Sequence, residues 1–165
     1  MDHVLNIYGE IERIARSIAD RLSWFGPTLG RLVVGWVFFQ SGWGKLNSLG
    51  QVTDFFTELG LPFPAFQALL ASTTELVCGG LLLLGLATRF AALPLIIVMV
   101  VALRTALWDQ IDGFSSLVGL AEFLYIALLA WIAVSGPGPL SLDRLLLRDR
   151  SDEPAGNLML RRARV

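Results

Sequence analysis

Residues 66–86 read FQALLASTTELVCGGLLLLGL, an apolar stretch whose one acidic residue, Glu75, lies near its middle. At a rise of about 1.5 Å per residue, a helix of about twenty residues crosses a hydrocarbon core of about 30 Å. Helix is the only open-ended structure that satisfies its own backbone hydrogen bonds in lipid. The stretch therefore predicts a membrane-spanning helix with a carboxylate inside it.

Three more apolar stretches of similar length accompany this one, and together they predict an all-α fold, an integral membrane four-helix bundle. The predicted spans are residues 28–46, 66–86, 90–108 and 116–135. Ahead of them, apolar residues recur at steps of three and four from Val4 to Leu22, which predicts an N-terminal amphipathic helix in the membrane interface. A cytosolic helix that packs on a partner is the alternative for this segment.

The same pattern divides the chain into three units. Residues 1–27 form the amphipathic helix, residues 28–147 the four-helix membrane domain, and residues 148–165 a mobile basic tail. Between the first two spans, Val52, Phe55, Phe56 and Leu59 form a short second amphipathic stretch. We expect that stretch to cap one mouth of the bundle.

The composition favours a lipid bilayer as the partner and excludes several other classes. Of 165 residues, 55% are hydrophobic and 16% charged, against about 25% charged in an average soluble domain. A net charge of -1 provides no basic excess for nucleic acid. The chain has one histidine, His3, and one cysteine, Cys78. It therefore cannot by itself build a bis-histidine haem site, a dithiol relay or a Cys/His metal site.

The distribution of basic residues predicts the orientation of the bundle. With four spans, both termini and the second connection share one side, and the opposite side carries only Lys45 and Arg104. The positive-inside rule then places both termini in the cytoplasm of a multi-pass inner (plasma) membrane protein. The basic residues on the cytoplasmic side are Arg13, Arg16, Arg21, Arg31, Arg89, Arg144, Arg148, Arg150, Arg161, Arg162 and Arg164.

Each predicted span carries one charge in the outer half of the bundle. Glu75 and Glu122 are acidic, and Lys45 and Arg104 are basic. Charges in the bilayer are costly unless they are paired, so we expect the two carboxylates to face inward and pair with the two cations, with Gln40 extending the network. Ser41, Thr73 and Thr74 are further candidates for that network. Two interpretations stay open: an ion-pair cluster that only fixes helix packing, and a polar pocket for a ligand with carbonyl groups.

The order and spacing of several short motifs resemble the DoxX family of four-helix membrane proteins. The resemblance covers residues 31–143. It rests on Arg31-x3-Gly35-x2-Phe38-x3-Gly42-x2-Lys45, on Leu61-Pro62-x-Pro64, on Glu75-x3-Gly79-Gly80-Leu81-x3-Gly85-Leu86-x-Thr88-Arg89, and on the ending Ser135-Gly136-Pro137-Gly138-x2-Ser141-Leu142-Asp143.

The resemblance implies a bacterial inner-membrane protein tied to redox metabolism. On the family pattern, the shared polar positions are Arg31, Lys45, Glu75 and Arg89, and contact with quinone is the role it implies for them. Asp143 is a further polar position that fits the family pattern. It also implies other membrane or periplasmic redox subunits as partners, or a homo-oligomer. The branch of the family and the electron donor stay open.

Two hypotheses of different class follow. In the first, a membrane subunit binds quinone near Gln40, Lys45, Glu75, Arg104 and Glu122 and couples oxidation of an outer-side donor to the quinone pool. The donor would be a sulfur compound, a thiol or a modified peptide. In the second, the chain is a non-catalytic membrane anchor, an assembly factor or a small-solute carrier. The sequence contains no separate catalytic motif, and whether the chain takes part in a quinone-dependent oxidoreductase stays open.

Overall fold

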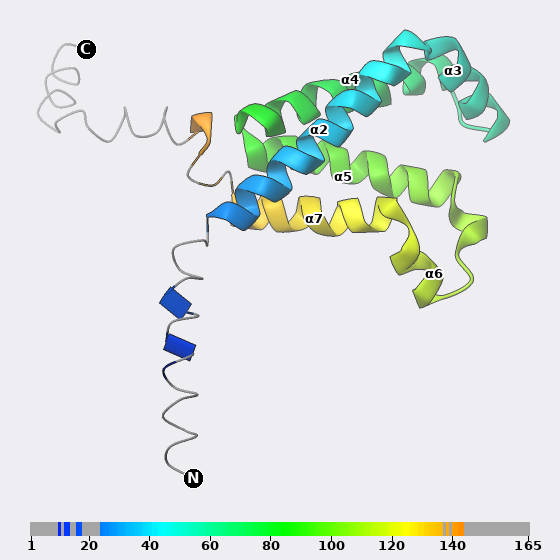
Figure 1. Ribbon diagram of the computed structural model, residues 1–165. Helices are drawn as coiled ribbons and strands as arrows, with labels where there is room; N and C mark the ends of the chain where they lie inside the picture. Colours follow the sequence, from blue (N-terminus) through cyan, green and yellow to red (C-terminus); the bar gives the residue numbers. More distant parts are fainter. Residues whose placement is uncertain are drawn as a thin grey trace, which may run out of the picture.

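The computed structural model describes residues 10, 12–13, 16–17, 24–136, 138 and 140–143, and these residues form helices and connections without any strand. Four long helices lie together, with α2 crossing α4 and with α5 packed along α7 (Figure 1). The long helices are α2 (Phe25–Asn47), α4 (Pro64–Leu84), α5 (Thr88–Thr105) and α7 (Ala121–Ser135). The shorter elements are α3 (Leu49–Glu58), the 3₁₀ turn η1 (Trp108–Gln110) and α6 (Phe114–Gly119).

The all-α prediction is confirmed, and the structure modifies the predicted spans. Two helices, α4 and α5, are long and apolar enough to cross a membrane. The predicted span 116–135 is interrupted at Leu120, whose backbone is extended (φ −79°, ψ 133°) between α6 and α7. The 15 residues of α7 rise about 22 Å, which is less than a hydrocarbon core. The four-span arrangement therefore stays a prediction.

The core of the described bundle lies between α2, α4, α5 and α7. Val34, Leu82, Leu95 and Leu129 have no exposed surface, and Ile132 has 1%. Burial of such side chains contributes about 1.5–3 kcal/mol each. Each long helix contributes at least one of these residues, so the four helices share a single core.

The outward faces of the same helices are also apolar. Trp36 on α2, Val77 on α4, Phe90 on α5 and Val134 on α7 are each more than half exposed. A contiguous apolar exterior of this kind is unfavourable in water and favourable against lipid tails. The exterior therefore supports the membrane assignment that the composition predicts.

Close contact between α2 and α4 depends on glycine. A Cβ atom on Gly42 would overlap the backbone of α4, where it would lie 2.7 Å from the carbonyl oxygen of Ser72. A Cβ atom on Gly79 would lie 2.5 Å from the backbone nitrogen of Phe39 on α2. Small residues at such crossings let two helix backbones approach each other in lipid. The glycines thus bring the polar side chains of α2 directly onto α4.

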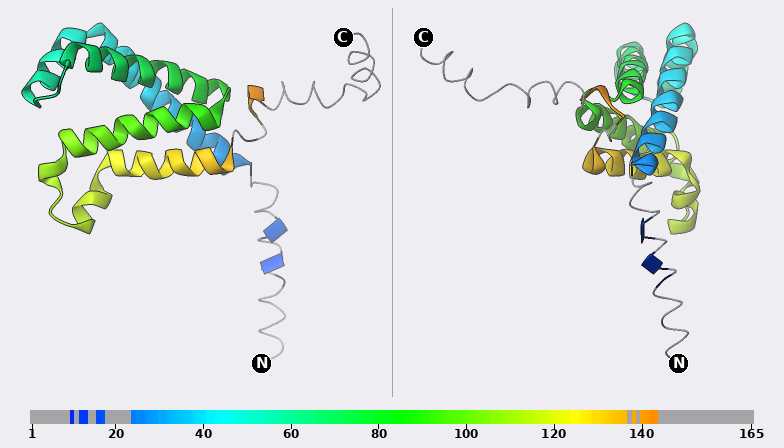
Figure 2. Two further views of the ribbon diagram at one scale, coloured as in Figure 1. Left: turned by 180° about the vertical axis from the view of Figure 1, so that it is seen from behind. Right: turned by 60° about the vertical axis from the view of Figure 1, so that its left-hand side comes forward.

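The two ends of the bundle carry different elements. Helices α3 and α6 lie at one end, whereas the tight α4–α5 hairpin and residues 140–143 lie at the other (Figure 2). The hairpin turns at Gly85 (φ 67°) and Ala87 (φ 48°), both in the left-handed region. We call these the α3 end and the hairpin end.

Much of the predicted N-terminal helix, and all of the predicted tail 148–165, falls outside the described residues. The described positions before residue 24 are helical and exposed, and they are Glu10, Glu12, Arg13, Arg16 and Ser17.

Candidate ligand-binding cavity

Glu75 is the buried charge around which the candidate site is built. It lies in the middle of α4 and has no exposed surface. One carboxylate oxygen accepts a hydrogen bond from the Nζ atom of Lys45 at 2.6 Å, and the other accepts one from the Ser41 hydroxyl at 2.8 Å. Both donors come from α2, one turn apart, on the face that Gly42 brings against α4. Of the two carboxylates and two cations expected to pair, the structure pairs Lys45 with Glu75.

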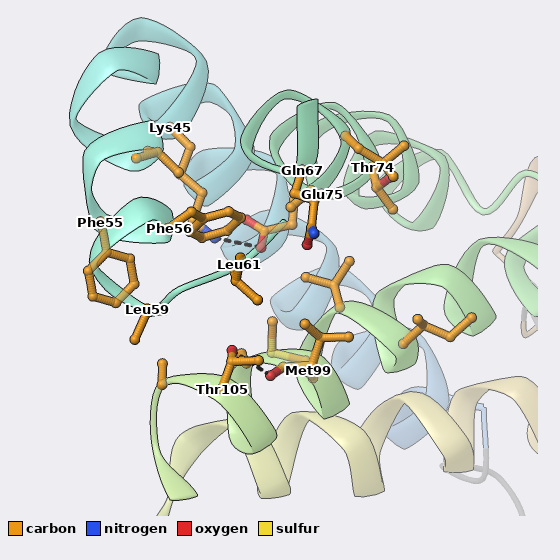
Figure 3. Close-up of a pocket in the computed structure, with 18 of the residues that line it drawn as sticks. Lys45, Phe55, Phe56, Leu59, Leu61, Gln67, Thr74, Glu75, Met99 and Thr105 are labelled. Atoms are coloured by element: carbon orange, nitrogen blue, oxygen red, sulfur yellow. Dashed lines mark hydrogen bonds and ion pairs between the residues drawn. The ribbon is translucent and has the colours of Figure 1, made fainter. Parts of the chain in front are cut away.

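A cavity of about 660 Å³ opens beside this pair. Figure 3 shows Lys45 and Glu75 joined at its edge, with Phe55 and Phe56 of α3 on one side and Met99 and Thr105 of α5 across from them. Its size lies within the range of about 300–1,000 Å³ typical of small-molecule sites. Helix α3 lines the cavity, as expected of a segment that caps one mouth of the bundle.

Most of the cavity wall is apolar. The contributing apolar residues are Val52, Phe55, Phe56, Leu59, Leu61, Leu70, Ala71, Pro94, Ile97, Val98, Met99, Val101, Ala102 and Ala106. The polar lining consists of Lys45, Ser48, Gln51, Gln67, Thr74, Glu75, Thr105 and Glu122. An apolar cavity with a few polar groups suits a ligand with a ring or chain body and a small number of hydrogen-bonding atoms.

The other predicted ligand-binding residues divide between the cavity and the surface. Glu122 lines the cavity from the first turn of α7. Gln40 is exposed on α2 and is not part of the lining. Arg104 is also exposed, and its guanidinium lies 4.3 Å from the ring centroid of Trp108 in a cation–π contact. The prediction that Arg104 pairs with a carboxylate is therefore wrong: among the described residues, Arg104 packs against Trp108 instead.

At the hairpin end, Asp143 closes the start of α5. Its carboxylate accepts hydrogen bonds from the backbone nitrogens of Ala87 at 2.8 Å and Thr88 at 3.2 Å. Its own backbone nitrogen donates to the carbonyl of Gly85 at 3.0 Å. A carboxylate at a helix N-terminus satisfies N–H groups that lack helical partners and interacts favourably with the helix dipole.

The two arginines of the hairpin end also bind backbone. Arg31 is 2% exposed, and its guanidinium donates to the carbonyl of Leu140 at 2.7 Å. It lies against Gly85, where any side chain would collide with it. Arg89 donates to the carbonyl of Val134 near the end of α7, at 3.4 Å. The family positions Arg31, Arg89 and Asp143 thus tie the chain together, away from the cavity.

Gln67 is a site residue that the sequence motifs do not indicate. Gln67, Ala71 and Glu75 follow one another at intervals of four, which places them on one face of α4, and all three line the cavity. The Gln67 amide donates to the carbonyl of Pro62 at 2.6 Å, which ties the α3–α4 connection to the cavity wall. Helical spacing from Glu75 is the signal that would have identified it.

Lys45, Glu75 and Glu122 give the cavity one donor cation and two acceptor carboxylates, which serve hydrogen bonding and proton transfer. Among the described residues, no three His, Cys, Asp or Glu side chains are grouped so as to hold a metal ion. Binding and orientation of an organic ligand is the chemistry that this lining supports.

Comparison with known proteins places the chain in a family. The DoxX family model matches residues 26–108. The chain belongs to the DoxX family. The match covers α2 to α5 and so includes both partners of the Lys45–Glu75 pair, whereas Glu122 and Asp143 lie beyond it.

Three relatives extend the similarity. An uncharacterized membrane protein, Rv3486 of Mycobacterium tuberculosis, is 38% identical over 130 residues, which cover 70% of this chain and 78% of that protein. A Bacillus subtilis protein named "Putative oxidoreductase CatD" is 30% identical over 129 residues, covering 77% of this chain and 91% of that protein. An uncharacterized Haemophilus influenzae protein is 30% identical over 120 residues, covering 70% and 80%. No solved structure matches the chain.

Proposed function

We propose that this DoxX protein is a membrane subunit that binds quinone in the cavity beside Lys45 and Glu75. The observation that carries the proposal is an apolar cavity of about 660 Å³ with, at its edge, the fully buried carboxylate of Glu75 paired with the half-buried Lys45. A quinone has an apolar ring and tail, which suit the wall, and carbonyl oxygens, which accept hydrogen bonds. The ammonium group of Lys45 has three N–H donors and gives one to Glu75, so it can also donate to a ligand oxygen.

In the proposed reaction, a donor on the outer side of the membrane is oxidised and the quinone is reduced. Reduction of one quinone to hydroquinone takes two electrons from the donor and two protons at the ring oxygens. The donor is a sulfur compound, a thiol or a modified peptide, which reacts with the quinone directly or through a partner subunit. The oxidoreductase name of the Bacillus subtilis relative is in accord with this class of reaction.

We also propose that α2, α4, α5 and the α6–α7 segment all span the inner membrane, with the hairpin end in the cytoplasm. The exposed apolar faces of all four long helices support this arrangement. Arg31 and Arg89 at the hairpin end agree with the positive-inside rule. Labelling of Glu58→Cys and Leu142→Cys in a Cys78→Ser background with a membrane-impermeant reagent tests it, and labelling of Leu142→Cys from outside intact cells would contradict it.

The binding proposal is tested on the full-length protein purified in detergent. Co-purified quinone is extracted and identified, and a quinone analogue is then titrated against wild type, Glu75→Gln and Arg104→Gln. Glu75→Gln removes the carboxylate that positions Lys45, and we expect binding to weaken about tenfold, or about 1.4 kcal/mol. Arg104→Gln is the matched control. Arg104 is a charged residue in the same half of the bundle as Glu75, but it does not line the cavity.

Saturable binding that only the Glu75 variant weakens supports the proposal. No binding by a well-folded sample would contradict it, and the Lys45–Glu75 ion pair would then be a packing element of a membrane anchor or assembly factor. Equal weakening by both variants would place the site elsewhere.

A further inference from the structure

Glu122 is a second carboxylate in the cavity, and its surroundings differ from those of Glu75. Glu122 is half-buried in the first turn of α7 and lines the cavity. Among the described residues, no hydrogen bond or ion pair engages its side chain, whereas both oxygens of Glu75 have donors.

The charges that line the cavity are therefore unbalanced. Lys45 is the one cation of the lining, and it is bound to Glu75 at 2.6 Å. Arg104, the other cation of this half of the bundle, lies over Trp108 and does not line the cavity. A carboxylate in apolar surroundings is stabilised by any group that donates a hydrogen bond to it. In the described part of the chain, that donor for Glu122 is missing, so a ligand can supply it.

The chemistry of the ligand follows from two charged side chains of the lining, the ammonium group of Lys45 and the carboxylate of Glu122. A carboxylate only accepts hydrogen bonds, and a quinone carbonyl also only accepts them, so the two repel each other. A hydroquinone hydroxyl donates. An alkylammonium ion would also satisfy Glu122, but it would bring a second positive charge into a cavity that already holds Lys45. A neutral ring with hydroxyl groups can donate to Glu122 and accept from Lys45.

We propose that Glu122 accepts a hydrogen bond from a ligand hydroxyl and that the cavity binds hydroquinone in preference to quinone. This inference rests on the proposed function, and it specifies the redox form of the quinone that the cavity prefers. Tenfold tighter binding of the reduced form would raise the two-electron potential of the bound quinone by about 30 mV. Selection of the reduced form thus makes the bound quinone a better electron acceptor, in the direction of the proposed reaction.

The test compares the two redox forms of one short-chain analogue on the full-length protein in detergent. Decylhydroquinone, kept reduced under anaerobic conditions, and the matching decylquinone are titrated against wild type, Glu122→Gln and Glu58→Gln. Glu58 is an exposed carboxylate at the end of α3 that does not line the cavity, so its variant is the control for lost charge.

We expect wild type and Glu58→Gln to bind decylhydroquinone about tenfold more tightly than decylquinone. In Glu122→Gln the preference should disappear, because the amide loses the charge and can donate to the quinone carbonyl. Glu122→Asp keeps the charge and should keep the preference. Circular dichroism and elution volume show whether each variant is folded. Hydroquinone binding by folded Glu122→Asp then shows that the effect of Glu122→Gln is on the ligand and not on the fold.

The possible failures are distinguishable. Equal binding of the two forms by wild type, or an unchanged preference in Glu122→Gln, overturns this inference, and quinone binding that weakens in Glu75→Gln would still support the proposed function. Tighter binding of decylamine than of decylhydroquinone also overturns it. No binding of either quinone form by folded wild type overturns both proposals.

Discussion

At the α3 end, the buried carboxylate of Glu75 is held by two side chains, whereas at the hairpin end the carboxylate of Asp143 is held by backbone N–H groups. The hairpin-end contacts join the first turn of α5 to the segment that follows α7, and the guanidinium groups of Arg31 and Arg89 there donate to backbone carbonyls. The α3-end contacts join only α2 and α4, and a cavity remains beside them.

This difference separates a structural cluster from a candidate site. Backbone partners belong to the fold, so the hairpin end is suited to fixing the arrangement of helices. Side-chain partners beside an apolar cavity keep unused hydrogen-bonding capacity, namely the remaining N–H groups of Lys45 and the carboxylate of Glu122. The same residue types therefore serve different purposes at the two ends.

The largest expected effect comes from breaking the pair at the α3 end. Lys45→Met leaves the fully buried carboxylate of Glu75 with only Ser41 as a donor. Removal of one partner of a fully buried pair costs about 3–5 kcal/mol, and because the Lys45 side chain is 37% exposed, the lower end of this range, about 3 kcal/mol, applies here. We expect a loss of this size in the free energy of unfolding, measured by denaturant titration in micelles.

The double variant Lys45→Met/Glu75→Gln separates stability from binding. It removes both charges, so it should recover most of the stability that Lys45→Met loses. It should not recover quinone binding. If the double variant bound quinone as tightly as wild type, the Lys45–Glu75 pair would not be part of a binding site, and the proposed difference between the two ends would be contradicted.

The second effect concerns the helix crossing that brings Lys45 to Glu75. Gly42→Ala places a methyl group against the backbone of α4 at Leu76 and Ser72, which cannot give way as a flexible side chain can. Overpacking of this kind costs about 1–3 kcal/mol. We expect lower stability and weaker quinone binding together, because the shift moves Lys45 away from Glu75.

Gly44→Ala is the control for this substitution. Gly44 lies on the same helix, and a Cβ atom there would meet nothing within 4 Å. Alanine is favoured over glycine inside a helix by about 0.5–1 kcal/mol, so the control should be as stable as wild type or more stable. Equal behaviour of the two variants would mean that the crossing does not limit the site.

The smallest effect is expected at the hairpin end. Asp143→Ala removes the acceptor of the Ala87 and Thr88 N–H groups, and loss of a helix N-cap costs about 0.5–2 kcal/mol. Quinone affinity should stay within twofold of wild type, because Asp143 is remote from the cavity lining. Asp143→Asn keeps one acceptor oxygen and should recover part of the lost stability. A large loss of affinity in Asp143→Ala would mean that the two ends are coupled.

Several features of the molecule were determined by the sequence alone. The all-α class follows from long apolar stretches, since helices are what such stretches form in lipid. The Lys45–Glu75 pair was predictable because charges inside apolar spans are costly unless paired. The amphipathic pattern around Phe55 predicted a short helix, and α3 is that helix. The family followed from the order of motifs between Arg31 and Asp143.

Other features were decided only by the tertiary structure. The break at Leu120 and the position of Arg104 over Trp108, four residues along the chain, are local geometry that hydropathy does not report. The capping of α5 by Asp143 depends on a contact between distant segments. Hydropathy reports how apolar a segment is, but not which way each side chain points once the helices pack. The sequence therefore placed four charges in one half of the bundle, and packing put three of them around a cavity and the fourth, Arg104, against an aromatic ring on the surface.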